Sequence, residues 1–298
     1  MSSITNRVYR DEKDFQIMID LLNEIRPADR FKEFPTKVDI EEDLALEETC
    51  ANIKLWFDEN KPIGWVYVDD SKNMHWELKK EYIETIGADM VTWAEACIRN
   101  TLGMGQKSTL DASCREGNKE RLAFIRKHGF HQTDFVTVGM KRSLSEPIPV
   151  PELPQGFSIR SVAGTGEAEA IASTHRAAFG TEYMTAENRL IIMNTSEYDP
   201  SLDLVAIAPD GTIAAYCTCS VNSDREGYTD PVATHPHFQR LGLAKALLLQ
   251  GLQLLKDRGM EFASLGTSSS NIAMQKAAKS AGFQLEYRVF WFEKEVSK

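Results

Sequence analysis

A short stretch in the second half of the chain combines residues that could hold a negatively charged group. Residues 239–244 read QRLGLA, and a long apolar pattern with helical spacing follows them. The first backbone N–H groups of a helix have no partner inside the helix and lie at the positive end of its dipole. Gly242 has no Cβ to keep a ligand away, and Ala244 is nearly as small. The stretch therefore predicts a phosphate or diphosphate site, to which Gln239 and Arg240 could add side-chain donors.

Two carboxylates precede this stretch on a predicted strand. Glu226 and Asp230 lie four residues apart, so they share one face of a regular strand. A carboxylate can take a proton from an ammonium ion directly or through a water molecule. Asp230 lies nearer to the loop and is the first candidate for a general base, and Glu226 is the second. The alternative role of Asp230 is that of an ordinary strand-end carboxylate before Pro231.

The strand and helix on either side of the stretch must position these groups. Pro231 and Pro236 bracket residues 232–235, and Pro231 removes one hydrogen-bond donor from the strand ladder. Backbone groups near Val232 and Thr234 could then pair with an extended ligand. The expected strands are 157–162, 202–208, 212–221, 227–234 and 262–267, with a final strand pair in 284–295. The expected helices are 167–179, 186–194, 243–258 and 271–281.

The first half of the chain repeats this order. NKERLAFIRKHGF (118–130) and NIAMQKAAKSAGF (271–283) both open on a possible N-cap Asn and end on Gly-Phe. The hairpin of the first half lies in 52–70 and its long helix in 88–102. A connector rich in proline, 143–156, separates two domains at 1–142 and 157–298. The pattern predicts an α/β fold with two tandem domains, each a mixed and mostly antiparallel sheet flanked by helices.

The stretch DPVATHPHFQRLGLAKALL resembles the acyl-CoA-binding motif of the GCN5-related N-acetyltransferase (GNAT) superfamily. The family pattern is Gln/Arg-x-x-Gly-x-Gly/Ala after a bulged strand, and Gln239, Gly242 and Ala244 meet it. The resemblance implies an N-acetyltransferase that uses acetyl-CoA as cosubstrate and needs no metal. Val232 and Thr234 would bond the pantetheine arm through their main chain. The cofactor-binding residues that it implies are Val232, Ala233, Thr234, Gln239, Arg240, Leu241, Gly242, Leu243, Ala244, Lys245 and Asn271.

The first half lacks this motif. Setting Gly87 against Ala244 puts Thr85 at the place of Gly242, with Glu84 inside the turn. A carboxylate there would repel a diphosphate. We therefore expect the first half to be a degenerate copy that shapes the structure or the substrate site.

The acceptor and the proton donor are less defined. Family members commonly carry a Tyr seven residues after the Asn of the last helix, whereas this chain has Ala278 there. We expect acetyl transfer to an amine of a small molecule or peptide. The alternative is an acyl-CoA-binding regulatory or scaffold protein without catalysis. A turnover assay would distinguish the two.

Composition restricts the other partners. The formal net charge is −10 and both halves are acidic, which argues against binding to nucleic acid or to an anionic membrane. Five cysteines and no apolar leader or membrane span predict a cytoplasmic protein. We expect a monomer or a homodimer. Cys217 and Cys219 share one face of a strand and are expected to be buried there without a metal.

Overall fold

The computed structural model describes residues 4–27, 35–45, 47–221 and 225–298. They form two compact units, residues 1–135 with 289–298 and residues 136–288. The packing units thus differ from the expected domains, because the last ten residues belong to the first unit and 136–142 to the second. That the first repeated copy ends at residue 142 and the second begins at residue 157 stays a prediction.

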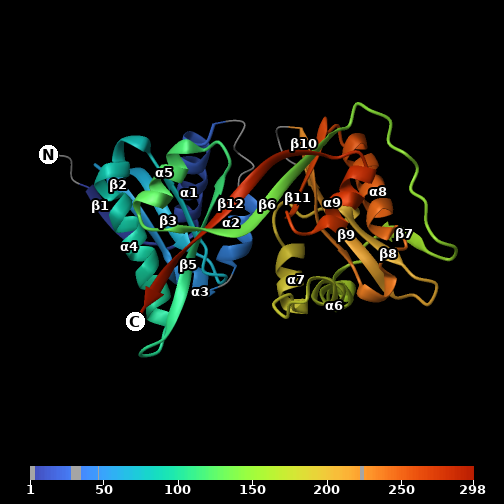
Figure 1. Ribbon diagram of the computed structural model, residues 1–298, viewed down its shortest axis with the longest axis horizontal. Helices are drawn as coiled ribbons and strands as arrows, with labels where there is room; N and C mark the ends of the chain where they lie inside the picture. The colour runs from blue at the N-terminus through green and yellow to red at the C-terminus, as the bar shows by residue number, and fades with distance from the viewer. Residues whose placement is uncertain (1–3, 28–34, 46, 222–224) are drawn as a thin grey trace. The chain divides into compact units, whose positions relative to one another are not determined.

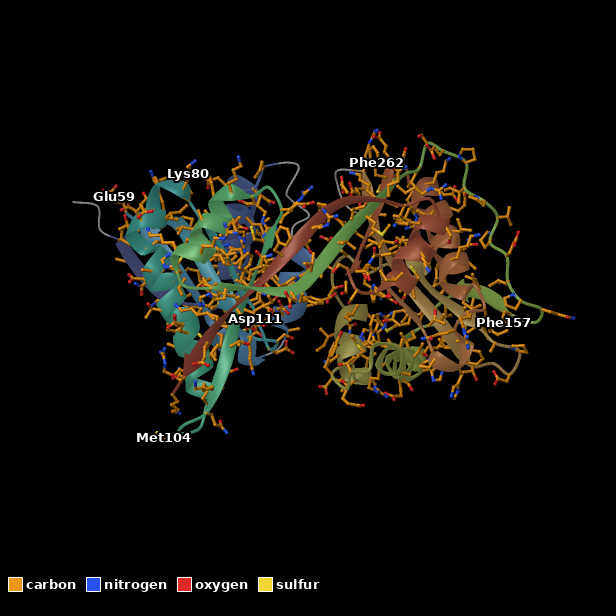
Figure 2. The ribbon with its side chains drawn as sticks, viewed as in Figure 1. Glu59, Lys80, Met104, Asp111, Phe157 and Phe262 are labelled. Carbon is orange, nitrogen blue, oxygen red and sulfur yellow. The ribbon has the colours of Figure 1, made fainter. Side chains whose placement is uncertain are left out.

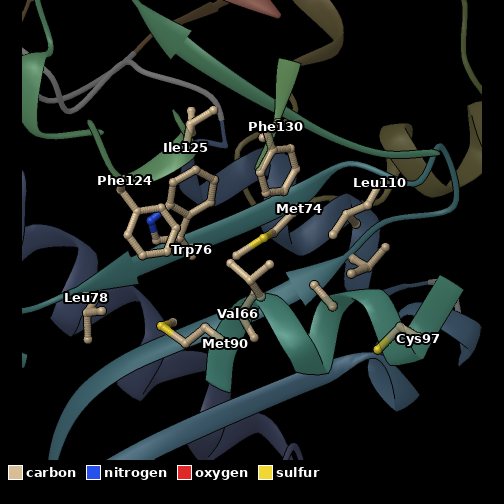
Figure 3. Close-up of a cluster of buried hydrophobic side chains, with 14 of the residues drawn as sticks. Val66, Met74, Trp76, Leu78, Met90, Cys97, Leu110, Phe124, Ile125 and Phe130 are labelled. Carbon is tan, nitrogen blue, oxygen red and sulfur yellow. The ribbon is translucent and has the colours of Figure 1, made fainter. Parts of the chain in front are cut away.

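The first unit contains a four-stranded antiparallel sheet and a separate strand pair. The sheet has the order β1 (Ile4–Val8), β2 (Ile53–Asp58), β3 (Lys61–Val68), β4 (Met74–Leu78). β5 (Lys107–Arg115) pairs antiparallel with residues 289–297 of β12 (Gln284–Ser297). The helices are α1 (Glu12–Ile25), α2 (Lys37–Leu44), α3 (Glu47–Ala51), α4 (Ile83–Thr101) and α5 (Lys119–Lys127). Side chains of β3, β4, α4 and α5 converge in its core, where Figure 3 labels Val66, Trp76, Met90 and Phe124.

The second unit is built on a six-stranded run. Its order is β6 (His131–Ser143), β11 (Phe262–Ser268), β10 (Glu226–Thr234), β9 (Ile213–Val221), β8 (Asp203–Ile207), β7 (Ser158–Ser161). Only the β10–β11 pair is parallel among these neighbours. The helices are α6 (Ala168–Phe179), α7 (Ala186–Met193), α8 (Leu243–Asp257) and α9 (Ile272–Ser280).

Helices α8 and α6 cover opposite faces of this sheet (Figure 1). Leu204 and Cys217 are paired and lie in the hydrophobic cluster that holds the leucines of α8. The next pair, Val205 and Tyr216, faces the other way and packs with Ile171 of α6. This alternation confirms the α/β fold class, with mixed sheets flanked by helices.

The expected repeat of the two short helices is present in the structure. Asn118 caps α5 by accepting a hydrogen bond from the N–H of Arg121, and Asn271 caps α9 by accepting one from Met274. Arg121 and Met274 therefore occupy the same position in the two helices. The buried placement of Cys217 and Cys219 is confirmed as well, with their Sγ atoms 3.8 Å apart and unbridged.

Two expectations about elements are wrong. The expected strand pair in 284–295 is one continuous strand, β12, because no residue with turn chemistry interrupts its run of aromatic and branched side chains. The long helix of the first half, α4, begins at Ile83 and not at residue 88. Glu84 and Thr85 therefore lie in its first turn and not in the preceding loop. The helix starts early because a short 3-10 turn, η2 (Lys80–Tyr82), leads directly into it.

Candidate functional site

The two parallel strands of the second unit separate part-way along their length. β10 pairs with β11 only at Glu226, Gly227 and Tyr228, opposite residues 262–264. The paired end begins at Phe262, which is labelled in Figure 2. Beyond Tyr228, β10 continues beside β9 but no longer pairs with β11, and its register shifts between Thr229 and Val232. This irregularity is the bulge that we expected at Pro231, and it accompanies an opening between the strands.

Backbone groups of β10 line this opening. The N–H of His235 donates to Ala214 of β9 at 2.9 Å, and Ala233 is paired with Tyr216. Since backbone groups alternate along an antiparallel strand, those of Val232 and Thr234 point away from β9, toward the opening. This is the direction needed for an extended ligand to add hydrogen bonds along β10.

The N-terminus of α8 follows this strand after the loop. Gly242 is the N-cap residue with φ of 78°, and no side chain in the described part of the chain caps the helix. The backbone hydrogen bond from Ala246 N to Gly242 O measures 3.0 Å, so the N–H groups of Leu243, Ala244 and Lys245 precede the intrahelical ladder. A Cβ added at Gly242 would meet no described atom within 4 Å. The geometry thus fits an anion with three convergent backbone donors.

The remaining loop residues surround this helix end. Gln239, Arg240 and Lys245 are exposed, and Leu241 is 41% exposed. Arg240 has a positive φ of 63°, which shows how sharply the chain turns before the helix. Leu243 is buried and anchors the helix in the core, whereas the two cationic side chains remain available for a charged ligand.

The structure separates the two carboxylate candidates. Asp230 is exposed at the point where the strands diverge, and its Oδ2 accepts a hydrogen bond from the N–H of Gly266 at 3.2 Å. Glu226 is 3% exposed at the closed end, where it accepts a hydrogen bond from Ser264 Oγ and lies 2.7 Å from Lys141 Nζ. Glu226 is thus held in a buried ion pair, and Asp230 is the carboxylate at the mouth of the opening.

Comparison with known proteins agrees with this geometry. Residues 168–283 match the acetyltransferase (GNAT) family. This part of the chain belongs to the GNAT family. Mycothiol acetyltransferase from Thermobispora bispora is 28% identical over 153 residues, which cover 48% of this chain and 52% of the relative. The match thus spans about half the length of that curated relative.

Two solved structures share the fold of nearly the whole chain. A GCN5-related N-acetyltransferase from Sphaerobacter thermophilus has a TM-score of 0.75 at 19% identity, covering 99% of this chain and 96% of its own. A tandem GNAT protein from the clavulanic acid biosynthesis pathway has a TM-score of 0.75 at 15% identity, covering 100% and 99%. The tandem architecture expected from the internal repeat is therefore shared with solved GNAT proteins.

Two residues on α9 bear on the chemistry of the GNAT domain. Asn271 accepts a hydrogen bond from Met274 N at 3.0 Å, so its side chain visibly serves the helix start. Ala278, at the position where the family commonly has a Tyr, is fully buried in the core. No hydroxyl at that position can protonate a leaving thiolate.

A chain of polar contacts on the α6 side, centred on the buried His175, was not identified from the sequence. His175 Nδ1 lies 2.6 Å from the hydroxyl of Tyr216, and Nε2 lies 3.0 Å from that of Tyr183. Burial, and then the charges of Arg189 and Arg176, lower the pKa of His175 to about 4, so its ring is neutral near pH 7. The signal that could have located it was the spacing of His175 and Tyr183 on either side of the α6 terminus, but this spacing is common.

One group of residues in the first unit has donor atoms close enough to hold a cation. Ligand atoms of Asp43, Asp69 and His75 lie within 4.8 Å of one another. His75 Nε2 is 2.8 Å from Asp69 Oδ2, and the hydroxyl of Tyr67 donates to Asp43 Oδ2 at 2.9 Å. These hydrogen bonds account for the arrangement without an ion.

The described residues contain no helix that is both long and apolar enough to cross a bilayer.

Proposed function

We propose that the second unit binds acetyl-CoA and that the protein transfers its acetyl group to the amine of a small molecule or peptide. The observation that carries this proposal is the opening between β10 and β11, which ends on the uncapped N-terminus of α8. Backbone donors of residues 243–245 would hold the diphosphate, and main-chain groups of Val232 and Thr234 would hold the arm.

The chemistry requires that an ammonium ion lose a proton before its nitrogen can attack. Acetyl-CoA supplies a thioester, whose acetyl group passes to the amine nitrogen as the carbon–sulfur bond breaks. Asp230 lies at the mouth of the opening and would accept the ammonium proton, directly or through water. With Ala278 in the core, the leaving thiolate would take its proton from solvent or from the acceptor.

The acceptor class follows from charge and from the relatives. An acidic chain with a net charge of −10 favours a cationic amine. Matched relatives are named mycothiol acetyltransferases, so unacetylated mycothiol belongs among the acceptors tested. The five cysteines are unbridged, which fits a reducing, cytoplasmic environment.

The test is a turnover assay with acetyl-CoA and a panel of amines, in which the free thiol of the released CoA is measured. We expect acetylated product from at least one cationic small amine or peptide. Binding of CoA without turnover on any member of the panel would instead support the alternative, a regulatory or scaffold protein, which the buried Ala278 favours. Absence of CoA binding would overturn both.

A further inference from the structure

The first unit has its own pair of separating parallel strands. Asn73, the residue just before β4, forms an isolated parallel bridge with Asp111 of β5, which is labelled in Figure 2. Beyond that bridge, the guanidinium of Arg121 spans the space between β4 and β5. Its Nε donates to the carbonyl of Ser113 on β5 at 3.0 Å, and Nη1 donates to the carbonyl of Trp76 on β4 at 3.3 Å.

Aromatic stacking holds this guanidinium in place. Arg121 Cζ lies 3.5 Å from the centroid of the Trp76 ring. That ring is itself stacked on Phe124 of the same helix at 5.2 Å, and both rings are labelled in Figure 3. A planar cation between an aromatic face and two carbonyl acceptors is a well-bonded arrangement, and it bridges the two strands.

The carbonyl of Trp76 corresponds to that of Val232 in the second unit. Glu77 pairs with Trp65 in the first unit, and Ala233 pairs with Tyr216 in the second. The β2–β3 and β8–β9 hairpins each contain one shift in register, and Trp65 and Tyr216 are the second paired residues beyond that shift. Lys79 N donates to Ile63 O as His235 N donates to Ala214 O. Trp76 directly precedes Glu77, as Val232 directly precedes Ala233. The backbone groups of Trp76 and Val232 therefore point away from the paired strand and into the gap.

The residue at the same helix position differs between the two units. Arg121 and Met274 both donate their backbone N–H to the capping Asn three residues earlier. In the second unit the side chain is the partly buried, uncharged Met274, and the described contact across the gap is the hydrogen bond from Gly266 N to the exposed Asp230 at the mouth of the opening. The backbone of Val232 is therefore left for a ligand, whereas that of Trp76 is taken by Arg121.

We propose that Arg121 is the residue that excludes an acyl-CoA arm from the first unit, because its side chain occupies the main-chain bonding position that the arm would need. This inference rests on the proposed function, since it uses the second unit as the template for arm binding. The start of α4 adds to the exclusion. Its N-cap Tyr82 has a right-handed conformation, with φ of −102°, and Glu84 places a carboxylate in the first turn.

The first experiment examines the first unit directly with a probe that has no phosphate. The five tryptophans are replaced by 5-fluorotryptophan, and the ¹⁹F signal of Trp76 is assigned with a Trp76→Phe variant. Pantetheine is then titrated into the parent and into Arg121→Met, which carries the residue found at position 274. We expect the Trp76 signal to shift with pantetheine in Arg121→Met and to stay unchanged in the parent.

The second experiment transfers the arginine to the second unit. Met274→Arg places a guanidinium at the matching helix position, and Met274→Leu is the control. Calorimetry should show that Met274→Arg weakens CoA binding about 30-fold or more, the scale for losing two hydrogen bonds, whereas Met274→Leu binds as the parent does.

The outcomes separate this inference from the proposed function. A pantetheine-induced shift of Trp76 in the parent, or no shift in a folded Arg121→Met, would overturn the role of Arg121. If the ¹⁹F spectrum of Arg121→Met loses its dispersion, the variant is unfolded. The pantetheine titration is then made with Arg121→Leu, and the Met274→Arg measurement tests the role of Arg121 independently. Parental CoA affinity in Met274→Arg also contradicts the inference. A parent that binds no CoA at all contradicts the proposed function, while the Trp76 comparison still tests Arg121.

Discussion

Asp230 is the residue whose chemistry the structure makes most testable. It is exposed where β10 and β11 diverge, and Gly266 N–H holds its Oδ2 at 3.2 Å. Asp230→Asn keeps the size of the side chain but cannot take a proton. We expect kcat to fall about 100-fold or more, the usual scale for losing a general base. CoA affinity measured by calorimetry should remain close to that of the parent.

The pH–rate profile gives an independent reading of the same residue. The acidic limb of the profile should shift or disappear in Asp230→Asn, and Asp210→Asn in the exposed hairpin turn serves as the control. Full kcat with the parental acidic limb would assign proton removal to Glu226 or to water. The buried Ala278 also predicts no steep alkaline fall caused by a tyrosine of α9.

Asp43 should make the stability of the protein depend on pH. Burial, and then the nearby carboxylates of Asp69 and Asp39, raise the pKa of Asp43 to about 7. Its pKa in the unfolded chain is about 4. The folded state therefore holds a proton that the unfolded state has lost between these values, so the free energy of unfolding falls as the pH rises from about 4 to 7.

Removing that titration should flatten the dependence. Asp43→Asn keeps an oxygen that accepts from the hydroxyl of Tyr67, which lies 2.9 Å from Asp43 Oδ2. Urea unfolding is measured at pH 5 and at pH 8. Between these pH values the free energy of unfolding should fall by on the order of 2 kcal/mol more in the parent than in the variant, since one pKa unit corresponds to about 1.4 kcal/mol. The exposed Asp20→Asn is the control. Parallel pH profiles for the parent and Asp43→Asn would contradict the assignment.

At the scale of elements, the turn before α8 is the feature on which the proposed cofactor binding depends. Gly242→Asp places a carboxylate beside the helix N-terminus, where an anionic ligand would be repelled. CoA binding should weaken by more than about 2 kcal/mol, because several charge-assisted hydrogen bonds are lost together. Thermal unfolding should change far less than the binding.

The same helix provides a matched control. Gly259, just beyond its C-terminal end, has a φ of 80°, and an added Cβ there would also meet no described atom within 4 Å. Gly259→Asp therefore imposes a similar backbone cost without approaching the N-terminus. Equal CoA affinities in the Gly242 and Gly259 variants would mean that the first turn of α8 is only a packing feature.

The elements that could be predicted from the sequence are those with local signals. Period-two and helical patterns, together with the two capping Asn residues, located α8, α9 and the hairpins. The Gly-containing loop led to the anion site that we propose, which stays a prediction. The start of α4 was missed because no capping residue marks it: Tyr82 makes no side-chain cap. The role of Arg121 depends on Trp76 and Ser113, which meet only after β4 and β5 are placed in space. No spacing in the sequence encodes that contact.

At the scale of the whole molecule, the two units should differ in cofactor binding. Among the residues that the structure describes, only the second unit combines an open strand gap with a glycine at the helix N-cap. We expect calorimetric titration with CoA or acetyl-CoA to saturate near one ligand per chain. The Gly242→Asp variant should show no saturable binding in the same range. A reproducible stoichiometry of two would contradict the claim that the first half is degenerate.

The last strand links the end of the chain to the stability of the first unit. Residues 289–298 belong to that unit, and Phe292 and Val296 of β12 are 1% and 2% exposed in its core. Truncating Phe292 to Ala leaves a cavity beside β5 and α4 and should cost about 3–5 kcal/mol. The expected effect falls on residues 4–135, far from position 292 in the sequence.

Hydrogen exchange measured by mass spectrometry can locate this effect. In Phe292→Ala, peptides from α4 and β5 should exchange faster, while those from α8 and β11 keep the protection of the parent. Leu285→Ala lies in the same strand but in the second unit, where Leu285 is 47% exposed, and should leave α4 and β5 unchanged. CoA affinity should survive in both variants, because the opening between β10 and β11 lies entirely within residues 136–288. Faster exchange spread equally over both units in Phe292→Ala would show that they unfold as one cooperative body, and that β12 does not divide its contribution between two cores.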